Sequence, residues 1–199
     1  MSTVLFLVRH AAHGLLKHKL VGRMSQVSLS EEGRRQAQAL GSRLAREELS
    51  LVQASPRDRA METAQAIARA ASVSLEQVDA LDELDMGEWT GKSFDELSVD
   101  VRWQAWNGRR SSARPPEGES MLEAQARIIG HIQHLAAGRP NGRIALVSHG
   151  DVIRSALLYL LMMPIDAYDR IEIDPASIST VVVGNWGAKV LSLNERIAP

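Results

Sequence analysis

The sequence contains no cysteine among its 199 residues, which excludes disulfides, catalysis by a thiolate and zinc sites with Cys ligands. It also lacks long hydrophobic runs. The longest early one, residues 4–8, is far too short to span a membrane, and Arg9 and His10 follow it at once. From these absences we expect a cytoplasmic protein without a membrane partner.

Neither sign of charge is in excess. Lysine and arginine number 23, aspartate and glutamate 24, and the formal net charge is −1. Such a chain has no overall attraction for nucleic acid, so we expect no nucleic-acid partner. The length fits one domain with a sizeable core but not two independent modules, and residues 1–199 are predicted to form a single domain.

Two short apolar runs, residues 4–8 and 144–147, have no polar alternation, which is typical of strands buried on both faces of a parallel sheet. Residues 51–54 form a similar but weaker run, which ends in Ser55 and Pro56. Helical patterns alternate with these strands. They cover residues 31–47 after a Ser30 N-cap, 57–71 after Ser55 with Pro56 at the first helical position, and 121–137.

The end of the chain has the pattern of a hairpin. Residues 178–183 and 189–193 flank a Gly-Asn-Trp-Gly segment, which indicates two strands at one edge of the sheet. The predicted fold class is therefore α/β. It is a three-layer sandwich in which helices flank a mostly parallel mixed sheet with one antiparallel edge strand.

Aromatic residues are scarce, and half of the eight lie in one stretch: Trp89, Phe94, Trp103 and Trp106. This stretch fits no strand of the sheet, so we predict a small helical cap inserted at about residues 84–118. Packing within the cap is favoured over substrate contact for most of the tryptophans. Its arginines could meet a second anionic group of a substrate, but solvent exposure is favoured for Arg102, Arg109, Arg110 and Arg114.

Side chains suited to phosphate follow the predicted strands. Arg9 and His10 end the first strand, Arg59 lies in the helical turn after the second, and His149 ends a later one. The carboxyl ends of parallel strands meet at one edge of the sheet, where ligands bind, so we expect these residues to converge.

Two predicted helix N-termini, near Pro56 and Gly150, point backbone N–H groups at the same edge, which favours an anion. Phosphate is the natural ligand for this combination. A neutral imidazole is a competent nucleophile toward phosphorus, and guanidinium groups offer paired donors to phosphate oxygens, so the chemistry requires no metal.

Six segments occur in a set order: LVRH at 7–10, LSEEG at 29–33, SPRDRAMETA at 55–64, LDMGEWTG at 84–91, EGES at 117–120 and VSHG at 147–150. Together they resemble the motifs of the histidine phosphatase superfamily, also called phosphoglycerate-mutase-like, over nearly the whole chain. One such fragment is weak evidence, but six in the expected order are strong.

The resemblance implies a role for each residue of the site. His10 would be the nucleophile that becomes transiently phosphorylated, while Arg9, Arg59 and the catalytic His149 would hold the phosphoryl oxygens. Glu83 matches the proton donor of the family, which protonates the leaving oxygen and then deprotonates water. The implied function is hydrolysis of a small phosphorylated metabolite through a phosphohistidine, without cofactor or metal.

Other carboxylates compete with Glu83 for the role of proton donor: Asp79, Asp82, Asp85 and Glu88. A proton donor must lie in the pocket with a raised pKa, whereas most carboxylates in such a stretch face water. Glu83 is favoured over the alternative, a solvated acidic loop.

The chain departs from the family pattern just after His10. Many members have a hydroxyl residue there and, a few residues later, an Asn that helps to hold phosphate, but residues 11–16 read AAHGLL. Either the pocket has fewer donors or His13 and Arg23 substitute for the lost ones. We take Arg23 as a candidate substrate-binding residue, while His13 could equally be an incidental surface histidine.

Three other functions stay open. Mutases tend to be longer, with a C-terminal tail over the site. Only residues 194–199 follow the last predicted strand, so hydrolysis is favoured over phosphoglycerate-mutase-type transfer.

A non-catalytic phospho-ligand binding protein would need neither nucleophile nor acid. A metal-dependent phosphoesterase would have few carboxylate ligands, since its set would be His10, His13, His18, His149 and Asp151. A homodimer is a possible assembly, although no feature of the sequence supports one.

Overall fold

The computed structural model describes residues 2–198, and these residues form a single sheet of six strands. The strand order is β3-β2-β4-β1-β5-β6. β1, β2, β3 and β4 are parallel, β5 is antiparallel to β1, and β6 is antiparallel to β5. The strands are β1 (Ser2–Arg9), β2 (Leu51–Ala54), β3 (Leu75–Gln77), β4 (Arg143–Ser148), β5 (Ser177–Gly184) and β6 (Gly187–Arg196).

The predicted strands and the edge hairpin are confirmed, as is the mostly parallel mixed sheet. Central strands such as β2 and β4 are buried almost throughout, which explains why they are mostly apolar. Gln53 in β2 is a buried polar exception, and its side-chain nitrogen donates to Glu76 at 2.8 Å. The sequence did not predict β3, because two of its three side chains are exposed and it contains only one apolar residue.

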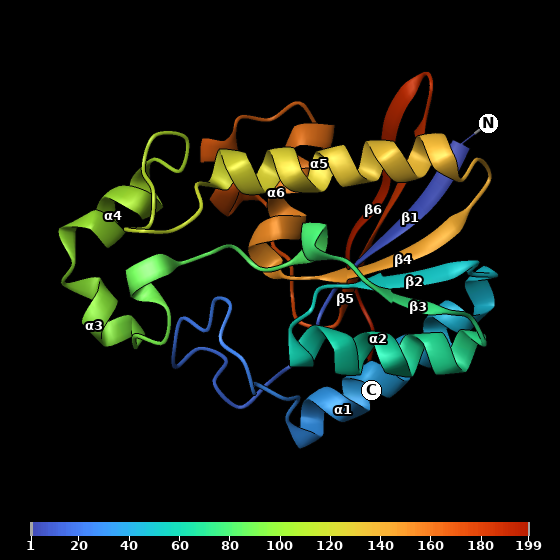
Figure 1. Cartoon of the computed structure of the whole chain (residues 1–199), viewed down its shortest axis with the longest axis horizontal. Helices are drawn as coiled ribbons and strands as arrows, with labels where there is room; N and C mark the ends of the chain where they lie inside the picture. Colours follow the sequence, from blue (N-terminus) through green and yellow to red (C-terminus); the bar gives the residue numbers. More distant parts are fainter. Residues whose placement is uncertain (1, 199) are drawn as a thin grey trace.

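Helices cover both faces of the sheet (Figure 1). α1 (Glu31–Leu44) and α2 (Asp58–Ala71) lie on one face, and α5 (Met121–Gly138) and α6 (Gly150–Leu160) lie on the other. A separate cluster of buried apolar side chains fills the space on each face, so the three-layer sandwich is confirmed. Short 3₁₀ helices cover Ala45–Glu47, Asp79–Leu81, Gly87–Trp89 and Ile165–Arg170. In residues 2–198, no helix combines the length and apolar character required to cross a membrane.

α2 begins later than the sequence pattern predicts. Its first residue is Asp58, and Arg57 occupies the N-cap position without a side-chain hydrogen bond, so Pro56 precedes the helix. Placing Pro56 at the first helical position was therefore wrong. The physical reason is that Ser55 makes tertiary contacts here: its hydroxyl donates to Asp82 at 3.2 Å, besides accepting from the Arg57 N–H at 3.3 Å.

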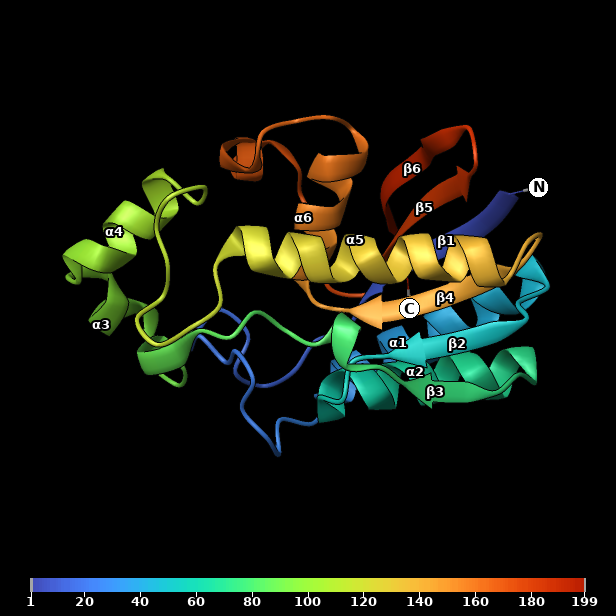
Figure 2. The same cartoon turned by 45° about the horizontal axis from the view of Figure 1, so that its top comes forward.

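Two short helices, α3 (Phe94–Ser98) and α4 (Val101–Gly108), lie beyond the carboxyl ends of the parallel strands (Figures 1 and 2). Trp89 and Trp106 are fully buried here, and their rings meet edge to face with centroids 6.3 Å apart. Trp103 packs edge-on against Trp89 at 5.2 Å. The favoured packing role is thus confirmed for these tryptophans, although Trp103 also lines a cavity described below.

Gly33, in the first turn of α1, packs against the loop that follows β1. A Cβ atom at this position would lie 1.9 Å from the carbonyl oxygen of Ala12. Gly33→Ala is therefore expected to lower the free energy of unfolding by about 2–4 kcal/mol, because the backbone must shift. Gly130→Ala, on the exposed side of α5 with open space around the new Cβ, should raise it by about 0.5–1 kcal/mol. Urea unfolding measures the free energy of unfolding of both variants. Equal changes in the two would contradict the close packing of Gly33 against Ala12.

Candidate active site

The predicted phosphate-binding residues meet where β1 and β4 end side by side. Arg9 is the register partner of Ser148 in the parallel pair, and the His10 N–H donates to the Ser148 carbonyl at 2.9 Å. His149 follows directly at the start of α6. The ring centroids of His10 and His149 are consequently 5.1 Å apart, with the ring planes at 63°.

The tautomer of His10 follows from its two contacts. Nδ1 lies 2.8 Å from the carbonyl oxygen of Ala11, which can only accept, so Nδ1 carries the proton. Nε2 accepts a hydrogen bond from Arg59 Nε at 3.3 Å and therefore has a lone pair. Burial, followed by the charges of Arg59 and Arg9, lowers the pKa of His10 well below its usual value, so this lone pair belongs to a neutral, nucleophilic ring.

Arg59 joins the two imidazoles. Its NH2 lies 3.2 Å from His149 Nδ1 and donates to the Gly22 carbonyl at 2.8 Å. Within residues 2–198, its NH1 is buried without a hydrogen-bond partner, and so is Nε of Arg9. NH1 of Arg9 donates to the carbonyl of Ile173 at 2.5 Å. Buried guanidinium N–H groups are costly to leave unpaired, so both arginines keep donors available for an anion.

Glu83 reaches the same cluster from the loop between β3 and α3. Its Oε2 lies 3.5 Å from His149 Nδ1, and its Oε1 accepts from the Leu84 N–H at 2.8 Å. Burial raises the pKa of Glu83 to about 7, and repulsion from the carboxylate of Asp151 adds to the effect. A carboxyl group that titrates near neutrality can give a proton and take it back within one reaction cycle.

His13 and Arg23, the two candidates for replacing the missing Asn, lie in different places. The His13 ring is nearly buried, and its centroid lies 5.5 Å from that of His10. Its Nδ1 has no hydrogen-bond partner in the described part of the chain. Burial lowers its pKa to about 4, so the ring is neutral. The structure does not bring Arg23 to the cluster. Its guanidinium is bound to Glu119 at 3.1 Å, and Arg23 is not among the described residues that line the cavity.

A cavity of about 720 Å³ lies over Arg9, His10 and Arg59. The cap supplies part of its wall through Phe94 and Trp103. A cavity of this size, with convergent polar groups at its base, suits a small metabolite.

Another polar cluster on the cavity wall was missed from the sequence. The guanidinium carbons of Arg110 and Arg154 lie 3.7 and 4.1 Å from the ring centroid of Tyr168, whose hydroxyl donates to Asp151. Asp151 is also 3.8 Å from a nitrogen of each arginine. Solvent exposure was the wrong expectation for Arg110, which is only 7% exposed because Tyr168 and Trp106 cover it.

No group of three or more His, Asp or Glu side chains within residues 2–198 is placed to hold a metal ion. The set considered for a metal-dependent phosphoesterase, His10, His13, His18, His149 and Asp151, is therefore not assembled in the described part of the chain.

Known proteins resemble this chain along most of its length. The model of the histidine phosphatase superfamily (branch 1) matches residues 5–196. Phosphoserine phosphatase 1 of Hydrogenobacter thermophilus is 28% identical over 195 residues, which cover 96% of this chain and 91% of that protein. The probable phosphoglycerate mutase GpmB of Cronobacter sakazakii is 31% identical over 179 residues, covering 88% and 83%.

The fold also has solved counterparts. The mycobacterial glucosyl-3-phosphoglycerate phosphatase Rv2419c superposes with a TM-score of 0.88 at 22% identity, covering 98% of this chain and 100% of that one. The family match includes residues of all six strands of the sheet, and it confirms the resemblance that the ordered motifs indicated. This chain belongs to the histidine phosphatase superfamily, branch 1.

Proposed function

We propose that this protein hydrolyses phosphomonoesters without a metal, through a phosphohistidine on His10. The observation that carries the proposal is the contact of Arg59 with His10, which marks a lone pair on a neutral imidazole at the base of the cavity. Arg9 and His149 beside it complete a set of donors that matches a phosphoryl group. The similarity to phosphoserine phosphatase 1 agrees with a phosphatase.

The first step forms the phosphoenzyme. When a phosphoryl group enters, the N–H groups of Arg59 and Arg9 turn to its oxygens, and the Nε2 lone pair of His10 is released. Nε2 then attacks phosphorus, so that a P–N bond forms and the P–O bond to the leaving group breaks. Glu83 gives its proton to the leaving oxygen.

The second step returns the enzyme to its starting state. Glu83, now a carboxylate, takes a proton from a water molecule, and the water oxygen attacks phosphorus. The P–N bond breaks, inorganic phosphate leaves, and His10 is again neutral. In both steps Arg9, Arg59 and His149 hold the phosphoryl oxygens while charge builds up on them.

We assign the missing donor near the phosphate to His13 rather than Arg23. The unpartnered Nδ1 of His13 and its position beside His10 support this assignment. Arg23 is instead held by the acidic side chain of Glu119.

The cluster around Tyr168 supports a substrate with a second anionic group. Arg110 lines the cavity, and its Nε and NH1 are buried without a hydrogen-bond partner among residues 2–198, although NH1 lies 3.8 Å from the Asp151 carboxylate. An anion there would accept hydrogen bonds from these two donors. Lys17 and Lys19 add positive charge to the cavity wall. Phosphoserine, named in one relative, carries a carboxylate that could serve as this group.

We further propose that residues 1–199 are one domain in which residues 84–118 form the cap insertion. The cap tryptophans Trp89 and Trp106 belong to the same buried cluster as α5 and α6, which supports a continuous core. The cytoplasmic location, the homodimer and the absence of nucleic-acid and membrane partners stay predictions.

Phosphate release from a panel of phosphomonoesters, with EDTA present throughout, tests the proposal. We expect hydrolysis that is insensitive to EDTA. Phosphoserine should exceed phosphoethanolamine, which lacks the carboxylate, by about tenfold in kcat/KM. Arg110→Met should remove this difference. Arg102→Met should not, because Arg102 is half exposed and lies outside the cavity lining.

Other outcomes would favour the alternatives. Loss of activity in EDTA would support a metal-dependent phosphoesterase. Isomerisation of a phosphoglycerate without phosphate release would support a mutase, which is the activity that the name of the relative GpmB gives. Binding of phosphorylated ligands without turnover would indicate a non-catalytic protein.

A further inference from the structure

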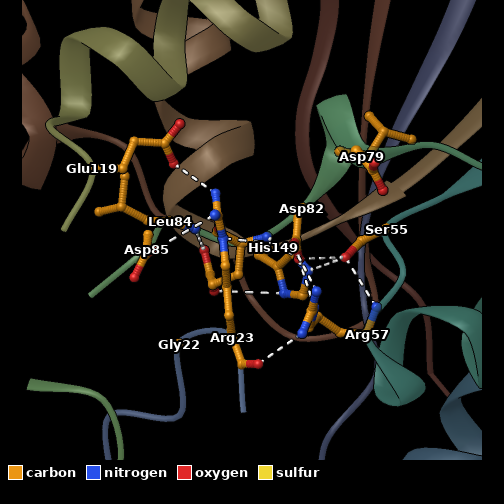
Figure 3. A network of polar contacts seen from close by, with 12 residues as sticks. Gly22, Arg23, Ser55, Arg57, Asp79, Asp82, Leu84, Asp85, Glu119 and His149 are labelled. Carbon is orange, nitrogen blue, oxygen red and sulfur yellow. Dashed lines mark hydrogen bonds and ion pairs between the residues drawn. The ribbon is translucent and has the colours of Figure 1, made fainter. Parts of the chain in front are cut away.

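Ser55 and Asp82 extend the hydrogen bonding of His149 beyond its Nε2 atom (Figure 3). Arg59 contacts the other ring nitrogen, Nδ1. His149 Nε2 lies 2.7 Å from Ser55 Oγ, which lies 3.2 Å from Asp82 Oδ1. His149 and Ser55 are fully buried, and Asp82 is only 7% exposed. The positions of the protons in this chain of contacts are therefore set by the protein.

The carboxylate of Asp82 is surrounded by donors. Arg57 donates to both of its oxygens, from Nε at 2.8 Å and from NH2 at 2.9 Å, and the Glu83 N–H donates to Oδ1 at 2.8 Å. Arg23 Nε adds an ion pair at 3.5 Å. Because Asp82 accepts from each of these groups, the hydroxyl proton of Ser55 points to it as well.

This arrangement fixes the tautomer of His149. Since Ser55 gives its one proton to Asp82, its oxygen accepts from His149, and Nε2 carries the ring proton. The opposite side of the ring agrees. Arg59 NH2 can only donate and lies 3.2 Å from Nδ1, so Nδ1 has a lone pair. Two independent contacts thus require the same tautomer.

We infer that Ser55 and Asp82 are positioning residues, which hold the Nε2–H tautomer of His149 and stabilise its imidazolium form when phosphate is bound. The inference rests on the proposed function. Once Arg59 turns to the phosphoryl oxygens, the Nδ1 lone pair is left beside them. A bound phosphate monoanion passes its proton to Nδ1, so an O–H bond breaks, an N–H bond forms and the phosphate becomes a dianion.

The new Nδ1–H donates back to the phosphate, and Asp82 balances the positive ring through Ser55. The arrangement is that of a histidine oriented by a buried carboxylate, with a hydroxyl group inserted between the two. His149 thus holds a dianionic phosphoryl group with a charged donor rather than with a lone pair.

The charges around His149 explain why protonation would accompany the ligand. In the ligand-free protein, burial and then the charge of Arg59 lower the pKa of His149 well below its usual value. A dianionic ligand adds negative charge beside the ring and opposes this effect. The charged and titratable groups that face the ring are Arg9 and His10 at the end of β1, Arg57 and Arg59 at the start of α2, and Asp82 and Glu83 in the loop after β3.

¹⁵N NMR spectroscopy of the histidine side chains tests the inference, with His149→Gln used to assign the two ring nitrogens. In the ligand-free wild type we expect a proton on Nε2 and none on Nδ1. Saturation with inorganic phosphate should raise the pKa of the ring and protonate Nδ1. In phosphate-saturated Ser55→Ala, this pKa should be lower than in the wild type by about one to two pH units, because a hydrogen bond to a charged group is lost.

The same variants give a kinetic measurement. Ser55→Ala should lower kcat about 10- to 100-fold with a smaller change in KM, and Ser55→Thr, which keeps a hydroxyl group, should restore both kcat and the titration of His149. If Ser55→Ala does not fold, the wild-type and Ser55→Thr spectra still decide the tautomer.

A proton on Nδ1 in the ligand-free wild type would overturn the inference. So would an identical titration of His149 in the phosphate complexes of wild type and Ser55→Ala. If inorganic phosphate fails to bind, the proposed function is overturned, whereas the ligand-free spectrum tests the tautomer by itself.

Discussion

His10→Ala is expected to stop phosphate release from every substrate of the panel and to lower kcat/KM by about 10⁴-fold or more. The reason is that Nε2 of His10 carries the nucleophilic lone pair, which accepts a hydrogen bond from Arg59 at the base of the cavity. Alanine offers no atom to replace it. The neighbouring arginines would still bind phosphate, so the loss should fall mainly on kcat. Steady-state assays in EDTA measure both parameters.

The matched control is His134→Ala, because His134 lies on an exposed side of α5, outside the cavity lining. It should keep full activity. A rapid acid-free quench with ³²P-labelled substrate should label wild type and His134→Ala but not His10→Ala. Retention of activity by His10→Ala would rule out the phosphohistidine mechanism.

The central sheet and the phosphate cluster could be predicted from sequence for the same reason. Strands buried on both faces need continuous apolar runs, so the polar residues that end them, such as His10 and His149, stand out in the sequence. The parallel register then brings these ends together. Arg59 was predictable too, because it occupies the first turn of the helix that follows β2.

Contacts between distant loops could not be predicted in this way. Arg23 has the charge to bind phosphate, but Glu119, which lies 96 positions away, binds it instead. The position of Tyr168 over Arg110 and Arg154 depends on a 3₁₀ segment with no periodic pattern. The contact of Ser55 with His149 was indicated in the sequence only by the polar character of Ser55 at the end of β2. The helical pattern that follows Ser55 suggested instead that this residue caps a helix.

Glu83→Gln is expected to lower kcat by about 10²- to 10⁴-fold with alkyl phosphomonoesters, whose leaving oxygens need a proton. With an activated aryl phosphate the loss should be much smaller, because that leaving group departs without one. Parallel assays of both substrate types measure the difference. Asp85→Asn is the matched control, since its carboxylate is 41% exposed and contacts the nearby Gly87 N–H and the Arg23 guanidinium. The same leaving-group pattern in Asp85→Asn would assign the proton donor to Asp85.

The pH dependence of the wild type provides a second test of Glu83. Its pKa is raised to about 7, so the protonated form that the first step requires declines as pH rises through that value. Turnover of alkyl phosphomonoesters should then fall about tenfold per pH unit well above pH 7, and Glu83→Gln should lose this limb of the profile. If turnover of the wild type instead begins to fall near the usual pKa of a glutamate, burial does not raise the pKa of Glu83.

The stability of the protein should depend on the same proton. A carboxyl group whose pKa is raised on folding gives a contribution that is fully present below the unfolded value of 4.5 and is lost as pH rises through about 7. Glu83→Gln removes the buried charge, so at pH 8 it should be more stable than wild type by about 1–3 kcal/mol. At pH 4 the two proteins should unfold alike. Denaturant titrations at both pH values measure this difference, and equal stability at pH 8 would mean that Glu83 is not desolvated.

Increased stability of Glu83→Gln at pH 8 combined with lost turnover of alkyl esters would identify Glu83 as a buried acid. Its carboxyl group is then retained for catalysis although it lowers the stability of the fold.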